Sequence, residues 1–157
     1  MSLPDFLASE ATLTALIAGF EDRSWPKERW AHAAHLALGA CYILDGDSAL
    51  DRLRTEIPRY NVSQGGENTE DSGYHETLTV FWHNVIRDYI ATLPEGLNRL
   101  AVVRDVVKEF APKRDLFVQY YDFDVVKSRE ARAKWIPPTT HESGTSWRWP
   151  KDVGGST

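Results

Sequence analysis

The chain has 157 residues, of which 42% are hydrophobic and 26% charged, and its net charge is −5. This length and composition fit one globular domain that buries a core without disulfides or a structural metal. Basic residues are interleaved with Asp and Glu, which argues against a nucleic-acid partner. The longest apolar run, residues 31–44, is too short to span a bilayer, and the first residues lack the positive charge of a secretory signal. We therefore expect a cytoplasmic protein with no membrane partner.

The chain contains a single cysteine, Cys41, within the longest apolar run. An internal disulfide is therefore impossible, and burial is the usual fate of an unpaired cysteine. We expect Cys41 to be a small core residue and not a nucleophile.

The N-terminal part of the sequence predicts two helices. Residues 11–22 carry apolar side chains at the three- and four-residue intervals of one buried face. A second helix is expected to begin at Ser24 or Trp25, with Pro26 in its first turn, and to end near Leu44, where a "DGD" sequence follows.

The middle of the chain predicts a third helix followed by a long loop. Asp47 can cap a helix that ends near Tyr60, and Pro58 should distort its last turn. Residues 61–73 are polar and Gly-rich, and the loop that they predict is longer than a minimal connection, which suggests a functional loop. Asn61, at its start, either ends the helix or lines a pocket.

The rest of the chain predicts further helices and no strand. A fourth helix should cover residues 73–93, a fifth should end before Pro112, and segments 114–123 and 128–135 read as two shorter helical pieces. The fold class that follows is all-α: a single-domain antiparallel helical bundle of about five main helices, covering residues 1–138.

Residues 139–157 form a separate C-terminal segment in this prediction. The segment contains turn-forming residues and no helical period. Two alternatives are open: a mobile tail, or an extended strap held by Trp147 and Trp149, since chain ends are ordered only when something ties them down. His141 lies in this segment and no pattern places it.

The predicted second helix carries an unusual polar stripe. At about 100° per residue, Glu28, His32 and His35 fall on one face, whereas nearly all later residues of this helix are apolar. Buried imidazoles need partners, and neutral His is a common ligand of Zn, Fe or Mn. The alternative for each ring is solvent, a backbone carbonyl or a Tyr.

The predicted fourth helix adds a second group of polar residues, in the sequence "GYHETLTVFWH". His75 falls within the apolar arc with Thr79 beside it, whereas Glu76 and His83 fall at its border with solvent. The alternative for Glu76 is a capping-box contact to the backbone three residues earlier, and a surface role is favoured for His83.

These two groups would meet if the second and fourth helices faced one another. The metal ligands would be His32, His35, His75 and Glu28, binding a divalent transition metal (Zn, Fe or Mn). The catalytic groups would be Glu76, Tyr74 and Thr79. Either Glu76 or Glu28 would serve as ligand or general base, and metal-activated water or oxygen would be the reactive species.

Three classes of function are therefore weighed. The first is a metal-dependent hydrolase or oxidoreductase acting on a small-molecule substrate. The second is a metal-free small-molecule site that uses a His and Glu pair. The third is a noncatalytic helical assembly protein, in which the C-terminal aromatic residues would favour a homo-oligomer.

Four segments of the chain together resemble a known family. They read "WAHAAHLALG", "IPRYN", "GYHETLTVFW" and "SREARAKWIPP". They resemble a family of short bacterial helical proteins of unassigned function with WxHxxHL and GYHETxT segments. The resemblance spans about residues 16 to 138, and it implies kinship but no particular reaction.

Overall fold

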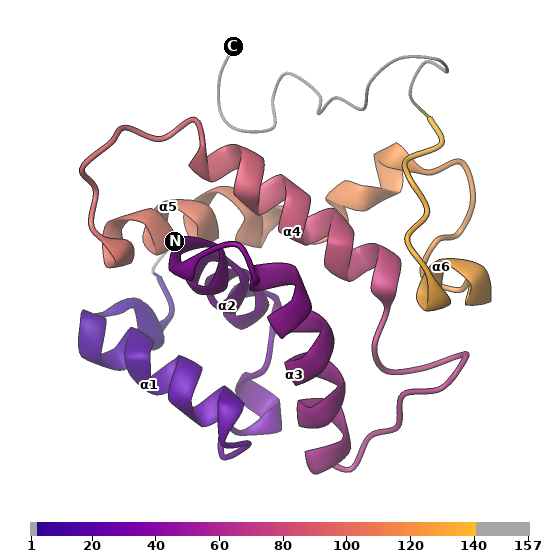
Figure 1. Cartoon of the computed structure of the whole chain (residues 1–157), viewed down its shortest axis with the longest axis horizontal. Helices are drawn as coiled ribbons and strands as arrows, with labels where there is room; N and C mark the ends of the chain where they lie inside the picture. Colours follow the sequence, from indigo (N-terminus) through magenta and orange to yellow (C-terminus); the bar gives the residue numbers. More distant parts are fainter. Residues whose placement is uncertain (1–2, 141–157) are drawn as a thin grey trace.

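The computed structural model describes residues 3–140, and within that range it contains helices and no strand. Figure 1 shows the helices packed around one centre. The all-α prediction is confirmed. The α-helices are α1 (Glu10–Glu21), α2 (His32–Asp45), α3 (Ala49–Ser63), α4 (Glu76–Ile90), α5 (Arg99–Phe110) and α6 (Arg129–Ala133). The 3-10 helices are η1 (Asp5–Leu7), η2 (Lys27–Arg29), η3 (Ala111–Lys113) and η4 (Leu116–Tyr120).

Helix α2 lies at the centre of the molecule and contacts α1, α3, α4 and α5 (Figure 1). Ala34 and every residue from Leu36 to Tyr42 are buried. This position follows from the sequence, because a helix without a polar face beyond its first turn must be covered on all sides. Cys41 is one of these buried residues, and burial raises the pKa of its thiol to about 12.

The predicted start of the second helix is wrong. Pro26 is followed by the short helix η2, and α2 begins only at His32. The Trp25 indole donates a hydrogen bond of 3.1 Å to the carbonyl of the last η2 residue, which closes that turn. Trp30 then leaves the helical conformation and stacks on Phe20, with 4.6 Å between ring centroids.

Helix α3 extends past Pro58 to Ser63, three residues beyond its predicted end. A proline inside a helix removes one backbone hydrogen bond. Burial of Tyr60 offsets this loss, because its hydroxyl donates a 2.6 Å hydrogen bond to the carbonyl of Trp25. The predicted distortion of the last turn therefore does not end the helix.

The two short helical pieces predicted near the C-terminal end are confirmed as η4 and α6. The Ser128 hydroxyl caps α6 by accepting a hydrogen bond from the Ala131 amide. The first residues of the predicted tail contact the bundle, because the amide of Thr139 donates a 2.9 Å bond to the carbonyl of Tyr120. Trp147, Trp149 and His141 lie outside the described residues.

The long loop between α3 and α4 is fastened to α6. The Arg129 guanidinium bonds both carboxylate oxygens of Asp71, at 2.8 and 3.1 Å. Arg132 donates to the carbonyl of Gly73 at 2.8 Å. These contacts hold the loop against α6.

Among residues 3–140, no helix is both long enough and apolar enough to cross a membrane.

Two glycines of this loop, Gly65 and Gly73, have positive φ angles of 88° and 81°. We expect Gly73→Ala to lower the free energy of unfolding by about 3 kcal/mol, because a Cβ atom there would collide with the Glu67 carbonyl oxygen. Gly65→Ala is the matched control: nothing lies within 4 Å of its Cβ position, so only the cost of the left-handed backbone, about 1 kcal/mol, applies. Urea unfolding measures both, and equal losses would contradict the predicted collision.

Candidate ligand-binding cavity

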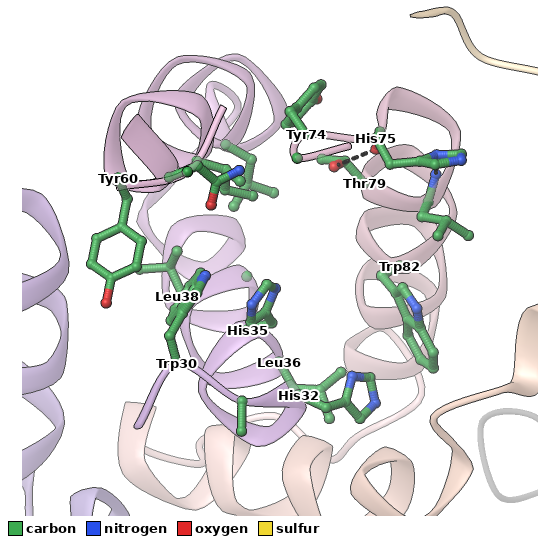
Figure 2. Close-up of a pocket in the computed structure, with 18 of the residues that line it drawn as sticks. Trp30, His32, His35, Leu36, Leu38, Tyr60, Tyr74, His75, Thr79 and Trp82 are labelled. Atoms are coloured by element: carbon green, nitrogen blue, oxygen red, sulfur yellow. Dashed lines mark hydrogen bonds between the residues drawn. The ribbon is translucent and has the colours of Figure 1, made fainter. Parts of the chain in front are cut away.

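A cavity of about 680 Å³ opens between α2, α3 and α4, beside the loop that joins α3 to α4 (Figure 2). Most of its wall is aliphatic or aromatic, and four of the five histidines of the chain line it. Its lining includes Lys27, Trp30, His32, His35, Asn61, Glu67, Tyr74, His75, Leu78, Thr79, Trp82, His83 and Arg114. Its size falls within the range of about 300–1,000 Å³ that is usual for small-molecule sites.

His35 projects from the first turn of α2 toward the middle of the cavity (Figure 2). One face of its ring stacks on Trp30, with 3.8 Å between the ring centroids. Neither ring nitrogen has a hydrogen-bond partner among the described residues. The His35 imidazole is thus a polar group of the wall that the described residues leave without a hydrogen bond.

His35 is exposed to the cavity, and the cavity walls bring protein atoms close to its ring on several sides. This enclosure lowers the pKa of His35 to about 3, and the nearby His32 acts in the same direction. Removal from bulk water disfavours the charged imidazolium. At neutral pH the cavity therefore contains an uncharged imidazole, which can exchange a hydrogen bond with a ligand.

His75 does not join His35. It is the N-cap of α4, one residue before the helix, and its ring lies on the far side of α4 from His35 (Figure 2). Nε2 donates to the Val125 carbonyl at 2.9 Å, and Nδ1 accepts from the Leu78 amide at 3.2 Å. The residue is 8% exposed, and burial lowers its pKa. Both nitrogens are satisfied by the backbone, so His75 is a structural cap in this fold.

His32 also bonds the backbone. Its Nε2 lies 3.2 Å from the carbonyl oxygen of Phe110, at the end of α5. Its ring meets Trp82 of α4 edge-on, with 4.9 Å between the centroids. Burial lowers its pKa, and the positive charge of Arg114 acts in the same direction. His32 therefore joins three elements at one end of the cavity.

The predicted set of four metal donors does not form. Glu28 belongs to η2 and is exposed. Because α2 starts four residues after it, Glu28 does not share a helical face with His32 and His35. Within the described part of the chain, no group of three or more His, Cys, Asp or Glu side chains is arranged to hold a metal ion. His32 and His75 each bond a backbone carbonyl, and His35 stacks on Trp30.

The predicted catalytic residues Glu76, Tyr74 and Thr79 lie together, but their polar atoms are already engaged. Glu76 accepts hydrogen bonds from Arg54 at 2.6 and 2.9 Å and from the Tyr74 hydroxyl at 2.7 Å. The Thr79 hydroxyl donates to the His75 carbonyl at 2.8 Å. Glu76 thus links α3 to α4 through an ion pair, and it makes no capping-box contact.

Other wall residues depart from the sequence prediction. His83, expected at the surface, lines the cavity, with Nδ1 3.0 Å from the Asn84 side-chain oxygen. Asn61 lies inside α3 and lines the cavity, as one of its two predicted alternatives has it. Sequence reasoning missed Trp30 and Arg114. Their only signal was position: Trp30 lies two residues before His32, and Arg114 lies two residues after the helix-ending Pro112.

Comparison with known proteins gives no match: no protein-family model fits the sequence, and no curated protein or solved structure is similar to it. The resemblance to a bacterial helical family stays a prediction for that reason. The fold and site define the chain as a helical bundle with a cavity between α2, α3 and α4.

Removal of metal is expected to leave the protein unchanged, because the predicted donors are not arranged as one ligand set. We expect dialysis against EDTA to shift the midpoint temperature of unfolding by less than about 1 °C. Differential scanning calorimetry before and after dialysis, with elemental analysis of both samples, measures this. A fall of several degrees that Zn, Fe or Mn restores would contradict it.

Acid should destabilise the protein partly through His35. Its folded-state pKa of about 3 lies below the ordinary value of 6.5, so the unfolded chain takes up a proton first as the pH falls. The neutral ring's contribution is complete above about pH 6.5 and is lost toward pH 3. The loss is small, because His35 is exposed to solvent on its cavity side.

His35→Phe keeps the stack on Trp30 and removes this titration. Urea unfolding at pH 7, 5 and 4 should therefore show a smaller loss of stability for the variant than for the wild type. If the wild type and the variant lost the same stability as the pH fell, His35 would have the same pKa in the folded and unfolded states, which would contradict the prediction.

Proposed function

We propose that this protein binds a small organic molecule in the cavity between α2, α3 and α4. The observation that carries the proposal is the His35 ring, which faces a cavity of about 680 Å³ without a hydrogen-bond partner among residues 3–140. Ligand sites commonly combine an apolar wall with a few polar groups that fix orientation. Here His35 is a polar group free to fix the orientation of a ligand, and Trp30 and Trp82 supply much of the apolar wall.

Binding is favoured over acid–base catalysis by the state of the neighbouring groups. The Glu76 carboxylate is held by Arg54 and Tyr74 and is not bonded to any histidine within residues 3–140. A His and Glu pair needs direct contact between its members to share a proton. The metal-dependent enzyme also loses support, because it requires the donors of two helices to meet at one point.

Aromatic side chains make the proposal testable with a neutral probe. A suitable probe is 2-naphthamide, which is planar, uncharged and has about 13 non-hydrogen atoms. A binding free energy of about 0.3–0.4 kcal/mol per atom corresponds to a Kd of roughly 0.1–1 mM. Titration by NMR should shift the indole N–H signals of Trp30 and Trp82. The signals of Trp25 and Trp135, which do not line the cavity, should stay in place.

A cavity-filling variant completes the test. Leu78→Trp places a larger ring inside the cavity and should abolish binding of 2-naphthamide, whereas Val118→Trp, at a position 59% exposed and outside the cavity, should leave it unchanged. Circular dichroism confirms that both variants are folded. Absence of binding to the wild type, or shifts at Trp25 instead of Trp30, would refute the proposed function.

A further inference from the structure

Two cationic side chains line the cavity without an anionic partner. Lys27 of η2 and Arg114, which follows η3, are both exposed, and neither forms an ion pair or side-chain hydrogen bond with a described residue. Most arginines of this protein are engaged: of the eleven in residues 3–140, all but Arg23 and Arg114 bond a carboxylate, a hydroxyl or a carbonyl through the guanidinium. The paired arginines are Arg29, Arg52, Arg54, Arg59, Arg87, Arg99, Arg104, Arg129 and Arg132.

The acidic residues do not neutralise this end of the cavity. Glu67, in the loop between α3 and α4, is the acidic residue in the described lining. Arg114 lies near His32, whose pKa its charge helps to lower, and His32 is bonded to Phe110 at the end of α5. His32 and His35 are one helical turn apart, so the Arg114 charge lies at the end of the cavity next to the unsatisfied imidazole.

The walls beside this end are flat rings. His35 is backed by Trp30 at 3.8 Å, and Trp82 stands across the cavity on α4, where it meets His32 (Figure 2). Aromatic faces favour stacked or edge-to-face contacts with another ring. A planar body can therefore lie between the His35 face and Trp82 better than a branched aliphatic one.

We infer that the ligand is a planar, largely apolar carboxylate whose acid group pairs with Arg114 while its ring system lies between His35 and Trp82. This inference rests on the proposed function, because it names the ligand class of the same cavity. A guanidinium presents paired N–H donors that match both oxygens of one carboxylate. Lys27 adds positive potential at the rim, which favours an anion entering the cavity.

A carboxylate fits this donor set better than a phosphate does. His35 is neutral at pH 7 and adds no positive charge, and the described lining has two cations against one acid. A phosphate dianion has three terminal oxygens to satisfy, which usually requires several cationic or amide donors. A single negative charge on a flat acid is balanced by one guanidinium.

The experiment compares 2-naphthoate with 2-naphthamide, which match in size and differ in charge. By isothermal titration calorimetry at low ionic strength, the wild type should bind the acid about 5- to 10-fold more tightly. This preference should shrink toward equality in about 0.5 M NaCl, where an exposed ion pair is screened. Arg114→Gln should weaken binding of the acid to the level of the amide and leave the amide unchanged.

Arg23→Gln is the matched control, because it removes the other unengaged arginine of the described chain, at a position that does not line the cavity. It should leave both affinities unchanged. Equal affinities for acid and amide in the wild type, or an acid preference that survives Arg114→Gln, would overturn the inference and leave the proposed function standing. Failure of both probes to bind in the cavity would instead refute the proposed function itself.

Discussion

The burial of α2 on nearly all sides is the constraint on which the rest of this structure depends. From Leu36 to Cys41 the helix carries no charged, amide or hydroxyl side chain, so α1, α3, α4 and α5 pack against it. Its first turn is different, because it carries His32 and His35. There α3 and α4 do not close over the helix, and the space between them is the cavity. One helix thus organises both the core and the site.

Most helices were predictable because their apolar residues recur regularly at three- and four-residue intervals. The predicted helix starts were wrong where a side chain, instead of the backbone, makes the hydrogen bond that ends a turn or caps a helix. Pro26 suggests a helix start, but the Trp25 indole closes a separate short turn, so α2 begins at His32. Histidine is not among the common N-cap residues, and the sequence therefore placed His75 inside the helix. His75 is buried, as expected, but its ring turns away from His35 and its partners are backbone atoms.

The candidate site was less predictable because it depends on how separate elements meet. Helical spacing identified His32 and His35 as a pair and His75 as buried, yet spacing within one helix gives no distance between two helices. Glu76 illustrates the same limit: its partner Arg54 lies 22 residues earlier, on α3. An acidic residue near histidines looks catalytic in the sequence, whereas here it joins two helices.

The unpaired state of His35 has a consequence for recognition. A neutral imidazole exists as two tautomers, and the hydrogen bonds of its nitrogens normally fix one of them. His75 is fixed in this way, since Nδ1 accepts and Nε2 donates. No such bond selects a tautomer for His35, which stacks on Trp30 through its ring face. The same side chain can therefore offer a proton to one guest and a lone pair to another.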